Sequence, residues 1–216
     1  MSYDRERVAA YFNDQRQTEW DRLGSTVNGR IRHAIHRRYL HEALNSVGTE
    51  NPTVLDVGSG PGRFAIDAAQ LGSKVMVTDV SQGQIDEAAV RIEEAGLADR
   101  MLGYGVHDVL DLSAFDDASF DVVVCFGGAV SYVREQYPRA LRELFRVARE
   151  RVLVSVMTVH GALRLAGALD ASEVFEQPDV TLPWQQILEG EPVIYSRNAE
   201  EWHLPLVLFT SDGLCS

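Results

Sequence analysis

Short apolar runs alternate with longer amphipathic stretches along the middle of the chain. The apolar runs predict buried strands at 54–57, 75–78, 101–106, 120–126 and 152–157. Between these runs, apolar residues recur every three or four positions and predict helices at 64–71, 82–95 and 135–148. Strands that alternate with helices form a mainly parallel sheet with helices on both faces. The pattern therefore predicts an α/β fold.

Sequence signals at the helix ends support these assignments. Gly72 follows the first helix as a residue suited to its C-terminal end, and Ser81 precedes the second as an N-cap. The third helix is expected to bury Ala140, Leu141, Leu144, Phe145 and Val147.

The first 47 residues predict two amphipathic helices, at 3–23 and about 28–47. The second is expected to bury Ile31, Ile35, Leu40, Ala43, Leu44 and Val47. Its other face carries Arg30, His33, Arg37 and His41. This face is interpreted as a solvated surface or, alternatively, as part of a lid whose basic groups meet an anionic substrate. We expect no metal here, because no carboxylate or cysteine joins the histidines in a ligand pattern.

Composition and charge narrow the possible partners. The chain has 45% hydrophobic and 24% charged residues, as ordinary globular proteins do. Its net charge of −12 disfavours a nucleic-acid partner, because phosphate contacts require a basic surface. The longest apolar run, 122–130, is too short to span a bilayer, and residues 1–7 contain no apolar signal region. Cys125 and Cys215 lie in unrelated contexts, which fits a reducing compartment. We expect a cytoplasmic protein without a membrane partner.

A glycine-rich turn joins the first predicted strand to the first helix of the core. Gly58, Gly60 and Gly62 let the backbone adopt positive φ angles and approach a ligand closely, and the following helix offers unpaired N–H groups. Asp79 ends the next strand, 17 residues after Gly62, where a carboxylate accepts both hydroxyls of a ribose. Together these features predict an adenosine-containing ligand.

Asp56 indicates which adenosine-containing ligand is bound. In the dinucleotide-binding fingerprint this position is a buried apolar residue, and a carboxylate there would repel a pyrophosphate. The glycine spacing is also Gly-x-Gly-x-Gly, whereas the dinucleotide form is Gly-x-Gly-x-x-Gly. An acid beside the turn suits a ligand with a cationic tail, such as S-adenosylmethionine.

The stretch Val54-Leu-Asp-Val-Gly-Ser-Gly-Pro-Gly62, with Asp79 after it, resembles the class I S-adenosylmethionine-dependent methyltransferases. The resemblance implies a three-layer Rossmann-like fold, S-adenosylmethionine as cofactor and S-adenosylhomocysteine as product. It also implies that Tyr11 closes over the methyl group and that Asp108 and Val109 adjoin the adenine; alternatively, Asp108 only caps the next turn. The complete predicted cofactor set is Tyr11, Asp56, Gly58, Ser59, Gly60, Gly62, Asp79, Val80, Asp108, Val109, Phe126 and Gly127.

The C-terminal region departs from the strand and helix alternation. Prolines and aromatic residues without a clear period fill 160–208, which we interpret as an insertion that covers the site and sets specificity. The family's usual last helix and two antiparallel strands are missing from the predicted pattern, so the fifth strand would be an edge open to homodimerisation. We divide the chain, within one domain, into a helical lid (1–48), a cofactor-binding core (49–159) and a covering, truncated C-terminal part (160–216).

The resemblance and the acidic charge lead to a functional prediction. We expect transfer of a methyl group to an oxygen or nitrogen of a small molecule, since the Asn/Asp-Pro-Pro-Tyr motif of nucleic-acid and protein N-methylating branches is absent. His160 is the first candidate for a general base and His107 the second; a carboxylate, thiolate or neutral amine acceptor needs none. The alternatives are a non-catalytic S-adenosylmethionine-binding regulator and a nicotinamide-dependent dehydrogenase.

Overall fold

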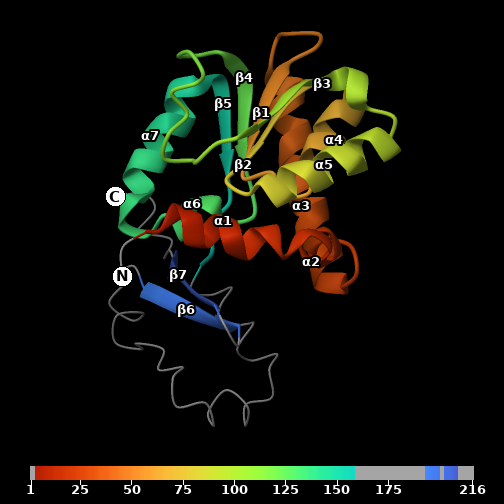
Figure 1. The fold of residues 1–216 in the computed structure, drawn as a ribbon. Helices are drawn as coiled ribbons and strands as arrows, with labels where there is room; N and C mark the ends of the chain where they lie inside the picture. Colours follow the sequence, from red (N-terminus) through yellow and green to blue (C-terminus); the bar gives the residue numbers. More distant parts are fainter. Residues whose placement is uncertain (1–2, 159–192, 200–201, 209–216) are drawn as a thin grey trace.

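The computed structural model describes residues 3–158, 193–199 and 202–208 of the 216-residue chain. A five-stranded parallel sheet forms its centre, in the order β3-β2-β1-β4-β5 (Figure 1). The strands are β1 (Thr53–Val57), β2 (Lys74–Asp79), β3 (Met101–Val106), β4 (Phe120–Cys125) and β5 (Ala148–Val154). This confirms the predicted α/β fold with a parallel sheet.

Helices cover both faces of the sheet. The helices of the core are α4 (Arg63–Gln70), α5 (Gln82–Glu94), α6 (Ala129–Tyr132) and α7 (Tyr137–Val147), with single 3₁₀ turns η1 (Ala98–Arg100) and η2 (Arg134–Gln136). Strand residues alternate between two hydrophobic cores: Val54 faces α4 and α5, whereas Leu55 faces α7. Ser81 caps α5, as predicted, by accepting a hydrogen bond from the backbone N–H of Gln84.

The N-terminal region forms three helices rather than the two predicted. They are α1 (Arg5–Asn13), α2 (Arg16–Arg22) and α3 (Val27–Ser46). The helix α1 ends at Asn13. The side-chain oxygen of Asn13 accepts hydrogen bonds from the Ser81 hydroxyl and the Gly83 backbone N–H. This long-range contact ties the end of α1 to the start of α5. Apolar periodicity alone could not reveal it.

The buried face of α3 is shorter than expected. Leu40, Ala43 and Leu44 are buried, but Ile31 and Ile35 are 54% and 49% exposed, so their predicted burial was wrong. Only the second half of α3 contributes buried side chains to the core. The prediction was also wrong for Phe145 in α7, which is 64% exposed.

The basic face of α3 is not simply solvated. His33 Nε2 lies 2.6 Å from one carboxylate oxygen of Asp67 in α4, and Arg37 Nε lies 3.1 Å from the other. These contacts join α3 to α4. The interpretation as a solvated surface was therefore wrong for His33, whose side chain is 22% exposed, whereas the side chain of Arg37 is 52% exposed.

Strand β5 begins four residues before the predicted run, at Ala148. Arg149, Glu150 and Arg151 are exposed within it, which an edge strand permits and a hydrophobic pattern does not reveal. Such charges also discourage pairing with another strand, so they weigh against the expected homodimer through this edge.

Two further strands, β6 (Val193–Ala199) and β7 (Trp202–Leu208), pair with each other in an antiparallel hairpin separate from the main sheet. The hairpin lies beside α6, on the side of the sheet where the parallel strands end (Figure 1). Among the described residues, no helix is long and apolar enough to cross a membrane.

Candidate functional site

A cavity lies at the carboxyl ends of the parallel strands, and most of the predicted cofactor residues line it. α1 and α2 run across this end of the sheet (Figure 1). The predicted residues that line the cavity are Gly58, Ser59, Gly60, Asp79, Val80, His107, Asp108, Val109, Phe126 and Gly127. Tyr11, Asp56 and Gly62 do not line it. His160 lies outside the described residues.

The glycine turn forms one wall of the cavity with a backbone that other residues rarely adopt. Gly58 and Gly60 have φ angles of 66° and 54°. A Cβ on Gly58 would lie 2.8 Å from the Cβ of Ala129, which follows β4. The segments that follow β1 and β4 therefore lie so close together that a side chain at position 58 would not fit between them. Gly62, which does not line the cavity, is the N-cap residue of α4.

Asp79 is held by the backbone at the edge of the cavity. One carboxylate oxygen accepts a hydrogen bond of 2.9 Å from the Gly60 N–H, and the other accepts one of 2.9 Å from the Ser81 N–H. Burial raises the pKa of Asp79 to about 6, although these two hydrogen bonds favour the charged form. Its carboxylate retains lone pairs that can accept ligand hydroxyls.

Asp56 lies beneath the glycine turn and is 1% exposed. Its carboxyl group interacts with the Ala65 backbone N–H, and its Oδ2 has no hydrogen-bond partner among the described residues. Burial and the nearby Asp79 raise the pKa of Asp56 to about 8. Direct contact between Asp56 and the cationic tail of a ligand stays a prediction. In the structure Asp56 does not line the cavity.

Asp108 faces the cavity from the connection between β3 and β4. Its Oδ1 accepts a hydrogen bond of 2.9 Å from the Leu110 N–H, and its Oδ2 accepts one of 2.7 Å from the hydroxyl of Tyr3. Tyr3 also lines the cavity. The N-terminal segment thus meets the residue that the family resemblance assigns to the adenine.

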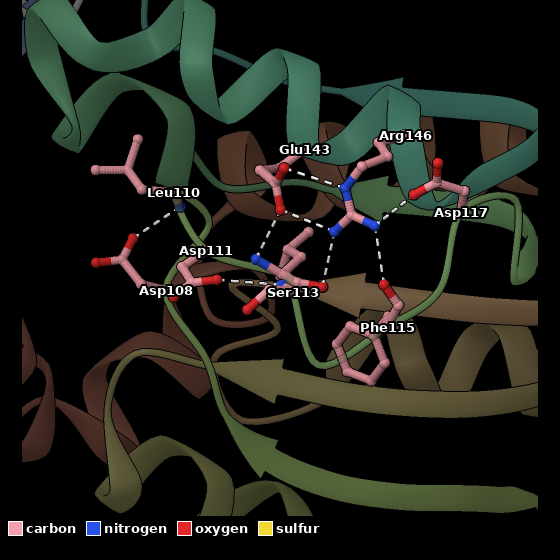
Figure 2. Close-up of polar contacts among 9 residues, drawn as sticks. Asp108, Leu110, Asp111, Ser113, Phe115, Asp117, Glu143 and Arg146 are labelled. Carbon is pink, nitrogen blue, oxygen red and sulfur yellow. Dashed lines mark hydrogen bonds and ion pairs between the residues drawn. The ribbon is translucent and has the colours of Figure 1, made fainter.

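The connection that carries Asp108 and Val109 is anchored by Arg146 of α7 (Figure 2). Arg146 donates hydrogen bonds of 2.9 Å to the carbonyl oxygens of Leu112 and Phe115. Its guanidinium also binds the carboxylates of Glu143 and Asp117, at 2.9 and 2.8 Å. Glu143 in turn accepts the Leu112 N–H at 2.9 Å. This network fixes the backbone just after the predicted adenine-binding residues.

The cavity is also lined by charged residues of α2 and α4 that were not predicted as site residues from the sequence. Glu19 and Arg22 of α2 line the cavity and form an ion pair of 2.7 Å. Arg63 also lines it; its guanidinium stacks on the Trp20 ring, 3.9 Å from the centroid, and donates to the Trp20 carbonyl oxygen. The basic groups at the cavity therefore come from α2 and α4, not from the α3 face that was predicted as an alternative.

Phe12, rather than Tyr11, is the aromatic residue of α1 that lines the cavity. The Phe12 ring contacts Tyr132 edge to face, with 5.3 Å between centroids. Both rings lie in the helix predicted at 3–23, but the sequence did not show which of them faces the cavity.

His107 lines the cavity far from the end of β4. Burial lowers its pKa, which favours the neutral imidazole that a base requires. However, β3 and β4 are separated by β2 and β1, so the ends of these strands lie roughly 14 Å apart at the usual strand spacing. A role for His107 as a base near Gly127 stays a prediction that this separation disfavours.

Comparison with known proteins places the domain in a family. Residues 54–151 match the family model described as a methyltransferase domain. These residues are similar to the class I S-adenosylmethionine-dependent methyltransferases, in agreement with the resemblance seen in the sequence. S-adenosylmethionine is the cofactor of this family, as the glycine turn and Asp79 predicted.

The similar proteins include methyltransferases with different acceptors. The chain is 31% identical over 142 residues to the tRNA 5-carboxymethoxyuridine methyltransferase of Escherichia coli K12, with 64% of this chain and 52% of that protein covered. It is 29% identical over 160 residues to the malonyl-[acyl-carrier protein] O-methyltransferase of Serratia marcescens, with 73% and 53% covered. The chain therefore spans about half the length of these relatives.

The fold is also found in a solved structure. The PH0226 protein of Pyrococcus horikoshii is 19% identical, with a TM-score of 0.64 and with 91% of this chain and 86% of that one covered. At this identity the likeness supports the three-layer methyltransferase fold and no further property.

The residues at the cavity fit the family's cofactor. A Cβ on Gly60 would meet only the Gln84 Oε1, 3.8 Å away, so the chain leaves room for a ligand beside this glycine. The Gln84 Oε1 is buried without a hydrogen-bond partner among the described residues, and Gln84 lines the cavity. Such an oxygen can accept a hydrogen bond from a ligand hydroxyl or amine.

Proposed function

We propose that the chain transfers a methyl group from S-adenosylmethionine to an oxygen or nitrogen atom of a small molecule. The observation that carries the proposal is one cavity lined by the glycine turn, by Asp79 and by the end of β4. In an α/β sheet, ligands bind at the carboxyl ends of the strands, where neighbouring connections diverge. S-adenosylmethionine supplies a methyl group on a positively charged sulfur, which the lone pair of an acceptor displaces.

The geometry supports a role for each part of the cavity. Asp79 accepts the ribose hydroxyls, and Val80, Asp108 and Val109 adjoin the adenine. At the other end, Glu19 binds the ammonium group of the tail and Arg22 binds its carboxylate. Phe12 and Tyr132 exclude water from the ligand. The protein thereby orients the reactants and lowers the polarity around them, and these are its main contributions to the rate.

Two observations bear on the acceptor. The net charge of −12 favours a small molecule over a nucleic acid. The name of one relative specifies a tRNA substrate, so a tRNA acceptor remains the competing possibility for this chain. Both relatives' names also contain a carboxyl-bearing group, carboxymethoxy in one and malonyl in the other. These names favour an acid among the small molecules.

Methyl transfer from S-adenosylmethionine with a labelled methyl group tests the proposal. The purified chain is incubated with malonyl-pantetheine, with a set of small hydroxy acids and amines, and with unmodified bulk tRNA. We expect label in a small molecule, none in tRNA, and loss of transfer in Asp79→Ala. Transfer to tRNA alone would refute the small-molecule assignment. Cofactor binding without transfer to any acceptor would favour the non-catalytic regulator.

A further inference from the structure

Arg134 is a buried cation without a strong partner. It begins η2 and is 4% exposed. Its Nε and Nη1 are buried and have no hydrogen-bond partner among the described residues. The nearest carboxylate is that of Glu135, whose Oε2 lies 3.7 Å from Nε and whose side chain is 59% exposed. This contact is too long for a hydrogen bond.

The backbone of Arg134 is also strained. Its φ angle is 55°, a left-handed conformation that side chains other than those of Gly, Asn and Asp rarely adopt. Strained backbone and unpaired buried polar groups gather at functional sites, where a ligand supplies what the fold does not. The chain has a net charge of −12, yet no carboxylate among the described residues lies within hydrogen-bond distance of this guanidinium.

Arg134 lies next in the chain to residues of the cavity wall, although it does not itself line the cavity. Tyr132 and Val133, which directly precede it, line the cavity. Arg22 reaches the same end, because its Nη2 lies 3.2 Å from the point that a Cβ on Gly127 would occupy. Arg22 is already paired with Glu19. Arg134 has no such close partner among the described residues and is therefore the positive group that would attract an anionic acceptor.

We propose that Arg134 binds a carboxylate group of the methyl acceptor. This inference rests on the proposed function and deepens it, because it assigns the acceptor to the carboxylic acids. A guanidinium matches the planar geometry of a carboxylate and forms charge-assisted hydrogen bonds with it. The bound acid would supply the partner that Nε and Nη1 lack and would neutralise the buried charge.

The test measures the binding of malonate to the full chain saturated with S-adenosylhomocysteine. Calorimetry and thermal unfolding are followed at constant ionic strength, with neutral malonamide and inorganic phosphate as comparison probes. We expect malonate to bind and to raise the melting temperature, and malonamide to do neither. Arg134→Met should weaken malonate binding at least roughly tenfold, because it removes the charge partner. Arg134→Lys should bind malonate more tightly than Arg134→Met and more weakly than the wild type.

Two further readouts separate a binding role from a structural one. Arg142→Met, at an exposed arginine of α7, is the matched control and should leave malonate binding unchanged. Arg134→Met should unfold at the same or a higher temperature than the wild type without malonate, since it removes an uncompensated buried charge. If that variant does not fold, Arg134→Gln is measured in its place.

The outcomes that overturn the inference are distinct from a failure of the proposed function. Absence of malonate binding to the wild type would overturn it, and so would equal malonate binding by Arg134→Met. Phosphate binding at Arg134 that matches or exceeds malonate binding would also overturn it. The proposed function fails separately, if S-adenosylhomocysteine itself does not bind. Arg134→Met should bind S-adenosylhomocysteine as the wild type does.

Discussion

Asp79 makes ligand binding dependent on pH. Burial raises its pKa to about 6, so the ligand-free protein holds Asp79 protonated below this pH and charged above it. Ribose hydroxyls donate to the carboxylate, so S-adenosylhomocysteine should bind more tightly as pH rises from about 5 to about 7 and then reach a plateau. Asp79→Asn should bind roughly thirtyfold more weakly and lose this dependence, since a charged hydrogen bond contributes about 2 kcal/mol. Calorimetry across this pH range measures both effects.

The control for that experiment is Asp86→Asn, at an exposed acid on α5. It should reproduce the affinity and the pH profile of the wild type. If Asp79→Asn keeps the wild-type pH profile, then another group is responsible and Asp79 does not contact the ribose.

Asp56 makes the stability of the ligand-free protein dependent on pH. Its pKa is about 8 in the folded state and about 4 in the unfolded chain, so between these values the folded state holds one proton more. The free energy of unfolding therefore falls as pH rises through this window, by up to about 1 kcal/mol per pH unit from this group. Asp56→Asn removes this contribution.

The stability of Asp56→Asn relative to the wild type should therefore improve steadily between about pH 5 and pH 8. Urea denaturation of both proteins at several pH values measures the difference, with Asp86→Asn again as control. A difference that stays constant with pH would show that the pKa of Asp56 is not raised in the folded state.

The residues that line the cavity at the glycine turn could be predicted from the sequence, because their spacing along the chain identifies them. Gly58, Gly60 and Asp79 lie where the pattern placed them. Arg22 and Arg134 could not be found in this way, because their significance depends on which distant backbone they approach and on whether a partner is present. Nothing in the sequence around Arg134 distinguishes it from the neighbouring surface arginines.

At the scale of elements, the connection between β3 and β4 depends on α7 for its conformation. Arg146→Ala removes two hydrogen bonds to backbone carbonyls and the contacts with Glu143 and Asp117 (Figure 2). We expect about 2 kcal/mol of lost stability. Amide exchange should become faster in residues 107–118, and S-adenosylhomocysteine should bind more weakly because Asp108 and Val109 lose their fixed position.

Hydrogen exchange and calorimetry test this prediction, with Arg142→Ala as the matched control on the same helix. The control should leave both measurements unchanged. Unaltered exchange in residues 107–118 of Arg146→Ala would mean that the connection is held by other contacts.

Strongly periodic elements were predicted well, and elements shaped by long-range contacts were not. The five parallel strands and the helices α4, α5 and α7 follow from hydrophobic spacing. The break after Asn13 depends on a contact with α5, and the exposure of Ile31 depends on how far α3 extends along the sheet. The early start of β5 could not be predicted from hydrophobic spacing, because an edge strand tolerates charged residues such as Arg149.

At the scale of the whole molecule, the net charge distinguishes between possible acceptors and the fold does not. Similar sequences include proteins named as a tRNA methyltransferase and as a malonyl-[acyl-carrier protein] O-methyltransferase, so membership of the fold does not select an acceptor. The net charge of −12 favours a small molecule over a nucleic acid, and the buried guanidinium of Arg134 favours one that carries a negative charge. The parts of the chain predicted to set specificity, 160–208, lie largely outside the described residues.

The most direct test of the account is a calorimetric titration of the full chain with S-adenosylhomocysteine, with NADH as the competing ligand and Asp79→Ala as the variant. The account predicts micromolar binding of S-adenosylhomocysteine that is lost in Asp79→Ala, and no binding of NADH. Tight binding of NADH, or undiminished binding of S-adenosylhomocysteine by Asp79→Ala, would contradict the assignment of the cavity.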